Sequence, residues 1–138
     1  KNEFYDHQGS HWAPHLIHKD VWTKIGGFSE EFNPGFGSDP DLIMKLWKNG
    51  VRIFKGISKF RIYHFGSIVS RKKKGLKTNK GSRTFLLKWG ITVNFFKRFY
   101  LKTGINYDGP LKKPKKNLIF CYFYILYIAF FHIFLFIC

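Results

Sequence analysis

The sequence predicts an α/β fold for a small globular part, followed by a helix associated with a membrane. Helix signals at residues 19–25 and 39–49, and alternating hydrophobic residues within 51–65, predict the globular part. The last 22 residues, 117–138, contain no Lys, Arg, Asp or Glu and predict the membrane segment. At 138 residues, the chain has room for one small domain besides this segment.

The two predicted helices have recognisable ends. The segment 19–25 has apolar residues at helical spacing, and Gly26 and Gly27 end it because glycine readily takes a positive φ. In the second helix, Asp39 can serve as the N-cap and Pro40 suits the first helical position. The residues expected to form its buried stripe are Leu42, Ile43, Leu46 and Trp47.

Three further segments complete the expected elements. Val51–Lys55 and Phe60–Phe65 alternate in hydrophobicity as short strands do. Arg83–Leu101 has aromatic residues at spacings of three and four, which indicates an amphipathic helix. Two placements of this helix stay open, either in a membrane interface or packed on the domain.

The net charge of +16 is unevenly distributed along the chain. Nearly all of the excess lies in residues 71–116, where Asp108 is the sole acidic residue. Charge and hydropathy together divide the chain into a globular part, a basic loop, an amphipathic helix with a basic linker, and a hydrophobic segment. Their expected bounds are 1–70, 71–82, 83–116 and 117–138.

The hydrophobic segment 117–138 is long enough to cross a bilayer as a helix, which takes about 20 apolar residues. Lysines stand directly before it at 112–116, around Pro114. Such lysines favour a cytoplasmic position for that end and attract anionic lipid headgroups. We therefore expect a membrane-associated protein whose globular part faces the cytoplasm.

A few side chains are candidates for chemistry. Asp39 and Asp41 stand at the start of a helix after a glycine-rich loop, where carboxylates act as general bases or simply offset the helix dipole. His64 ends a predicted strand, as a metal ligand or as a structural histidine. A zinc site formed by His7, His11, His15 and His18 is disfavoured, because Pro14 interrupts any helix that would align them.

Four motifs follow one another between residues 22 and 64. The chain reads WTKIGGFSEEF at 22–32 and GSDPDL at 37–42, and then has a glycine at position 50 and a predicted strand that includes His64. In this order and spacing the motifs resemble those of family 2 glycosyltransferases, which are inverting enzymes. The resemblance covers about residues 10–100.

This resemblance implies a fold and a set of roles. It implies the C-terminal, acceptor-side half of a GT-A-like domain, with residues 1–70 as its catalytic part. Asp39 matches the catalytic base, Asp41 the second acidic residue of that motif, and His64 the metal-binding histidine. The positions that match the acceptor pocket of the family are Trp12, Gly26, Gly27 and Phe28.

The resemblance also implies partners, and the sequence departs from the family pattern in two places. A nucleotide-sugar donor, a glycan or lipid-linked acceptor, and Mg²⁺ or Mn²⁺ in the complete enzyme are expected. Ser38 stands where the family usually has Glu, and no donor-binding strand or Asp-x-Asp motif of that half precedes residue 10. We therefore expect a fragment that is inactive without the donor-binding half.

Two other functions fit parts of the sequence. The basic run at 71–83 would neutralise nucleic-acid phosphates, although no recognition motif accompanies it. A non-catalytic, basic, membrane-anchored protein is the other alternative. Replacing Asp39 with Asn in the complete enzyme would distinguish these alternatives. Undiminished turnover would favour the non-catalytic protein or a different base.

Overall fold

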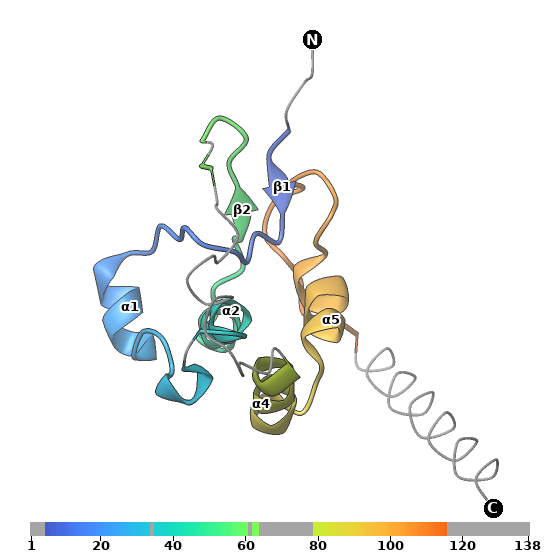
Figure 1. The fold of residues 1–138 in the computed structure, drawn as a ribbon. Coiled ribbons are helices and arrows are strands. Elements are labelled where there is room, and N and C mark those ends of the chain that lie inside the picture. Colours follow the sequence, from blue (N-terminus) through green and yellow to red (C-terminus); the bar gives the residue numbers. More distant parts are fainter. Residues whose placement is uncertain (1–4, 34, 61, 64–78, 116–138) are drawn as a thin grey trace, which may run out of the picture.

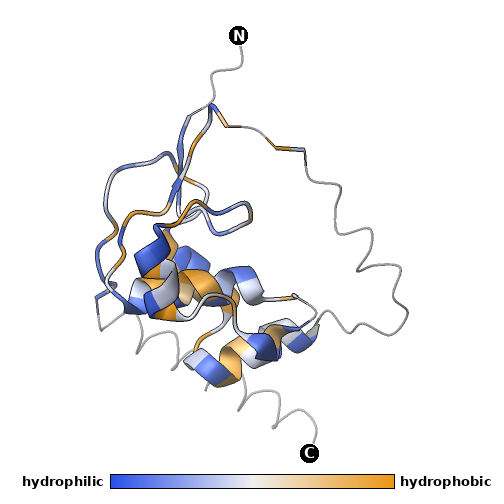
Figure 2. Ribbon diagram, turned by 90° about the vertical axis from the view of Figure 1, so that its left-hand side faces the viewer, coloured by the Kyte–Doolittle hydropathy of each residue, from blue (hydrophilic) through white to orange (hydrophobic). Residues whose placement is uncertain are grey.

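The computed structural model places its helices in one half of the molecule and a two-stranded sheet with its loops in the other (Figures 1 and 2). The structure describes residues 5–33, 35–60, 62–63 and 79–115. The sheet consists of β1 (His7–Gln8) and β2 (Lys55–Gly56). The helical elements are α1 (Lys19–Ile25), η1 (Glu30–Phe32), α2 (Ser38–Lys48), α4 (Asn79–Trp89), α5 (Val93–Phe95) and the π-helical turn η2 (Phe96–Leu101).

Helix α2 carries the largest share of the hydrophobic core. The stripe expected from its sequence is confirmed, since Leu42 is fully buried and Trp47 is only 4% exposed. Each such side chain contributes about 1.5–3 kcal/mol to folding by leaving water. Trp47 packs against Phe54 and Tyr100, with ring centroids 6.1 and 5.4 Å away. Helix α2 thereby connects the sheet side of the molecule to its C-terminal helices.

The N-terminus of α2 differs from the expectation. Gly37, with φ 89°, is the N-cap and offers no side-chain hydrogen bond. Asp39 therefore lies inside the first turn rather than capping it, and Pro40 follows in the same turn. Because the helix begins one residue before the expected cap, the Asp39 carboxylate is available to another segment of the chain.

The segment Arg83–Leu101 is not one amphipathic helix. Helix α4 ends at Trp89, and Gly90 takes a φ of 71° that breaks the helix. Thr92 then caps a second helical segment by accepting a hydrogen bond from the Phe95 amide at 3.1 Å. The apolar face is packed on the domain, with Phe85, Phe95 and Phe96 at most 2% exposed.

Of the strand expected at Val51–Lys55, only Lys55 is in a strand, and half of the strand expected at Phe60–Phe65 lies outside the described residues. The described sheet is an antiparallel pair with two residues in each strand. The Phe54 carbonyl accepts hydrogen bonds from the amides of both Gly9 and Ser10, at 2.8 and 3.1 Å. The described ladder ends at Gln8, next to this double contact.

The expected fold class is therefore wrong. A GT-A-like α/β domain requires several strands connected by helices, and the described part of the chain has only the short antiparallel pair. Within the same described ranges, no helix combines the length and hydrophobicity that crossing a bilayer demands. The membrane segment expected at 117–138 lies outside the described residues.

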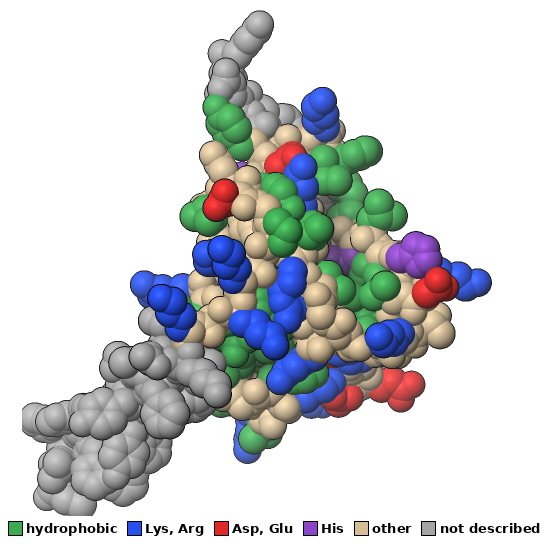
Figure 3. Space-filling model, turned by 180° about the vertical axis from the view of Figure 1, so that it is seen from behind, with side chains coloured by type: hydrophobic (Ala, Val, Ile, Leu, Met, Phe, Trp, Pro, Cys, Tyr) green, Lys and Arg blue, Asp and Glu red, His purple; other side chains and the backbone are tan. Residues whose placement is uncertain are grey.

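Basic side chains cover much of the surface seen from behind (Figure 3). Acidic side chains are sparse on the same face. The exposed basic residues of the described C-terminal part include Lys80, Arg83, Arg98, Lys102, Lys112, Lys113 and Lys115. Most of the positive charge on this described part thus lies in solvent, whereas Lys88 is paired with Asp41 and Glu31.

The sheet should lose stability in acid because of Asp6. Its hydrogen bonds with Lys55, at 2.7 Å, and with the Ser58 amide, at 2.8 Å, lower the pKa of Asp6 from 3.8 to about 2. A carboxyl group whose pKa is lowered by folding stabilises the protein above its unfolded pKa, and this contribution disappears as pH falls from about 4 to about 2. We expect the melting temperature of Asp6→Asn to depend less on pH across that window than that of the wild type.

The measurement is thermal unfolding followed by circular dichroism at several pH values between 2 and 5. Asp20→Asn is the matched control, because the Asp20 side chain is 87% exposed and lies on α1. A wild type and an Asp6→Asn variant with parallel pH profiles would show that this ion pair does not stabilise the fold.

Candidate active site

Asp39 is paired with a histidine from the loop between β1 and α1. The His15 Nε2 atom donates a hydrogen bond to Asp39 Oδ1 at 3.1 Å. The two side chains are 12% and 22% exposed, so the pair is partly shielded but remains open to solvent. Within the described residues, Asp39 Oδ2 makes no hydrogen bond. One carboxylate oxygen is therefore fixed, and the other is free to receive a proton.

Asp41, the second acidic residue of the motif, has a different environment. Its side chain is fully buried. Ser29 Oγ donates to Asp41 Oδ2 at 2.6 Å, and Trp89 Nε1 donates to Oδ1 at 2.8 Å. The Lys88 ammonium lies 2.9 Å from the same Oδ1 atom. With both oxygens engaged, Asp41 joins α2 to the segment before η1 and to α4, and its carboxylate does not face solvent.

Lys88 balances the charge of Asp41 and also contacts η1. Its Nζ atom lies 2.6 Å from Glu31 Oε1. Partial burial lowers the pKa of Lys88, but the hydrogen bonds to Glu31 and Asp41 outweigh this effect, and the pKa is raised overall. The same contact lowers the pKa of Glu31. Lys88 therefore stays charged at neutral pH and holds α4 against α2.

A second histidine, His11, lies near the Asp39–His15 pair. His11 Nδ1 donates to the Gly9 carbonyl at 3.0 Å, which leaves a lone pair on Nε2. This Nε2 atom is buried and has no hydrogen-bond partner among the described residues. Burial lowers the pKa of His11, and the charges of Asp39 and His15 also act on it. His11 is therefore a neutral imidazole within electrostatic range of Asp39.

Two aromatic side chains that were expected in the acceptor pocket, Trp12 and Phe28, are exposed. The His11 and Trp12 rings are 5.1 Å apart, and Trp12 is 64% exposed. Phe28 is 47% exposed and meets Trp22 edge-on at 5.4 Å. Exposed rings of this kind suit the apolar C–H faces of a sugar.

The turn at Gly26 and Gly27 positions Phe28. Gly26 is the C-cap of α1, as expected from the sequence. A Cβ atom on Gly27 would lie 2.7 Å from the Trp22 ring, so a larger residue there would force this ring to shift. Lys45 of α2 donates to the Gly27 carbonyl at 2.9 Å and ties the turn to the helix that carries Asp39.

The structure thus joins some of the expected site residues and leaves others apart. Asp39 and the Gly26–Gly27 turn are both tied to α2, whereas Asp41 is enclosed in the packing between helices. His64 lies outside the described residues, and those that are described include no group of three His, Cys, Asp or Glu residues able to hold a metal ion.

Sequence reasoning missed the two histidines beside Asp39. His11 and His15 were considered only as members of a zinc site with His7 and His18. The structure places His7 in β1, and His18 is the N-cap of α1. Of these four histidines, only His15 hydrogen-bonds to Asp39 among the described residues.

Comparisons with known proteins assign this chain to no family. Neither the protein-family models, nor the curated proteins, nor the solved structures give a match to this chain.

Proposed function

We propose that this chain is the acceptor-side part of an inverting glycosyltransferase, with Asp39 as the general base. The Asp39–His15 pair carries the proposal, because one carboxylate oxygen is held at 3.1 Å while the residue stays partly exposed. The motif order that resembles family 2 glycosyltransferases supports the same role for Asp39. The proposal depends on the local site and not on a particular fold, since similar chemistry occurs on unrelated folds.

The proposed reaction is a single displacement. Asp39 Oδ2 removes the proton of an acceptor hydroxyl while the oxygen of that hydroxyl bonds to the anomeric carbon of the donor. The bond from that carbon to the diphosphate breaks, and the nucleoside diphosphate leaves with the electron pair. His15 is a positioning residue, which holds Asp39 Oδ1 and so directs the second oxygen toward the acceptor.

The acceptor is proposed to be a glycan or a lipid-linked sugar, with Trp12 and Phe28 as stacking surfaces. Binding of the nucleotide sugar is proposed to need the donor-binding half that the resemblance implies. A divalent ion is implied by the resemblance, but the ligand set that it needs does not occur within the described residues. No step of the reaction is therefore assigned to a metal.

Replacing Asp39 with Asn in the complete enzyme should lower kcat by about 10²–10⁴-fold, because a carboxamide cannot accept the proton. The measurement is nucleoside diphosphate release from UDP-glucose, UDP-N-acetylglucosamine, UDP-galactose and GDP-mannose. We expect stability to change by less than about 1 kcal/mol, because the Asn side-chain oxygen can still accept the hydrogen bond from His15 Nε2.

Asp20→Asn is the control for this variant, since Asp20 is an exposed aspartate in the first turn of α1. Full turnover by Asp39→Asn would exclude Asp39 as the base. A complete enzyme that turns over none of the four donors would contradict the proposed glycosyl transfer itself.

A further inference from the structure

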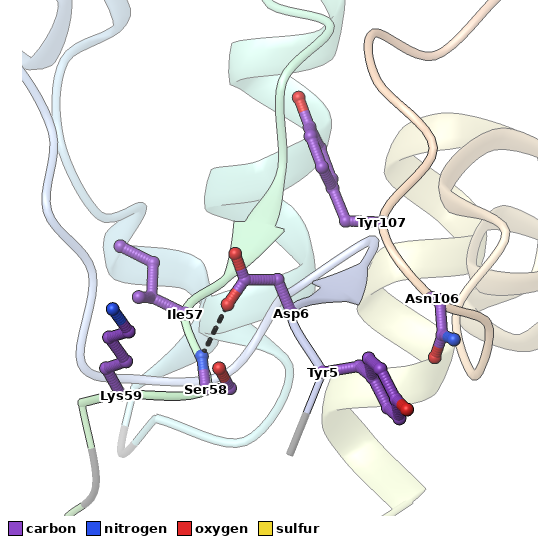
Figure 4. A pocket seen from close by; sticks show the side chains of 7 residues that line it. All are labelled: Tyr5, Asp6, Ile57, Ser58, Lys59, Asn106 and Tyr107. Carbon is purple, nitrogen blue, oxygen red and sulfur yellow. Dashed lines mark hydrogen bonds between the residues drawn. The ribbon is translucent and has the colours of Figure 1, made fainter. Parts of the chain in front are cut away.

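A second candidate site lies on the sheet side of the molecule, away from the Asp39–His15 pair in the sequence. It is a cavity of about 460 Å³, within the size range of small-ligand sites. Three segments of the chain line it (Figure 4). The lining residues are Tyr5, Asp6, Ile57, Ser58, Lys59, Asn106 and Tyr107.

Backbone hydrogen bonds fix the walls of this cavity. The Tyr107 amide donates to the Asp6 carbonyl at 2.8 Å, and an antiparallel bridge pairs His7 with Asn106. On the other side of the same strand, β1 pairs with β2, just before Ile57 and Ser58. The three segments are therefore held together without a ligand, and binding would need little rearrangement.

Asp6 stands at the centre of the cavity and is held in one orientation. One of its oxygens accepts from the Ser58 amide at 2.8 Å, which Figure 4 shows as a dashed line. The other lies 2.7 Å from the Lys55 ammonium, which also covers a face of the Tyr107 ring at 4.9 Å. The carboxylate and this ring thus have defined positions.

The chemistry of the lining matches a sugar better than it matches other small ligands. In Figure 4 the Tyr5 and Tyr107 rings lie below and above Asp6, and they offer apolar surface to C–H groups. Asn106, Ser58 and Lys59 supply donors and acceptors for hydroxyl groups, which are themselves both. The Asp6 charge is balanced by Lys55, so the lining suits a neutral ligand that carries hydroxyl groups, whereas an apolar ligand would leave these polar groups unpaired.

We propose that this cavity binds a sugar unit of a glycan. Its assignment to the acceptor of the transfer reaction rests on the proposed function, whereas the sugar binding itself does not. A sugar unit held here would anchor the acceptor chain independently of the Asp39 site. The cavity would then act as a binding subsite and would have no role in proton transfer.

The test is ligand-observed saturation-transfer NMR with the full 138-residue chain. The probes are lactose, maltose, cellobiose and N,N′-diacetylchitobiose. At least one probe should bind, and its affinity should fall about fivefold or more in Tyr5→Ala and in Asn106→Ala, because a stacking surface or a hydroxyl partner is lost. Two variants on different segments guard against misfolding of either one.

Leu87→Ala is the control, because it removes a 76% exposed apolar side chain of α4 that belongs to neither candidate site. Its sugar affinity should equal that of the wild type. The inference is overturned if none of the four probes binds, or if binding survives both cavity variants. Sugar binding in the cavity together with full turnover by Asp39→Asn would contradict the proposed function and support this inference. Loss of turnover in Asp39→Asn without sugar binding in the cavity would support the proposed function and contradict this inference.

Discussion

Replacing Asp41 with Ala is expected to lower the free energy of unfolding by about 3 kcal/mol or more. The carboxylate is fully buried and accepts hydrogen bonds from Ser29 and Trp89 while pairing with Lys88. Alanine would leave these donors without an acceptor, and the cost of an unpaired buried donor exceeds the value of the bond itself. Glu31 still contacts Lys88, which limits the loss at that residue.

Urea denaturation followed by tryptophan fluorescence measures this loss. Asp108→Ala is the control, because Asp108 is exposed and contributes only its backbone amide to Gln8. A loss below about 1 kcal/mol for Asp41→Ala would mean that the buried network does not hold α4 on α2. In that case, a direct catalytic role for Asp41 would have to be considered again.

The second large effect is expected for Gly9→Ala, measured against Gly90→Ala. Both glycines have a φ of 71°, so alanine brings the same backbone strain of about 1–2 kcal/mol to each position. At Gly9 the new Cβ would also lie 2.3 Å from the Leu101 carbonyl oxygen, whereas nothing lies within 4 Å at Gly90. We expect Gly9→Ala to be less stable than Gly90→Ala by about 1–3 kcal/mol.

Because the two variants share the strain, the difference between their urea midpoints reports the close contact alone. Equal losses would show that the first strand and η2 can move apart at little cost. The comparison also bears on the candidate active site, since the Gly9 carbonyl accepts the hydrogen bond that orients His11.

Local patterns in the sequence predicted the local elements. The apolar spacing of α1 and α2 was sufficient, because Gly26 ends one helix and the buried stripe of α2 repeats at helical intervals. The same reasoning failed at Gly90, where the aromatic spacing continues through a break that only the backbone reveals. It also failed for the strands, because β2 pairs with a segment almost fifty residues earlier.

The candidate site shows the same division. Asp39 was found from its motif, but its partner His15 comes from another loop, and no local pattern connects the two. The burial of Asp41 depends on Trp89, which is 48 residues away in the sequence. Contacts between residues so far apart in the sequence depend on tertiary packing. The motif with its two aspartates therefore does not indicate that Asp39 is partly exposed and Asp41 is buried.

The enclosure of Asp41 by residues of α4 has a consequence for how the protein can be divided. Helix α2, which carries Asp39, is packed against Lys88 and Trp89 of α4, and both contact its buried residue Asp41. The core likewise combines Leu42 with Phe85 and Phe96. A shortened chain ending before α4 would therefore lack six of the fourteen buried residues of the described core, so we expect α2 and the segment from α4 onward to fold together.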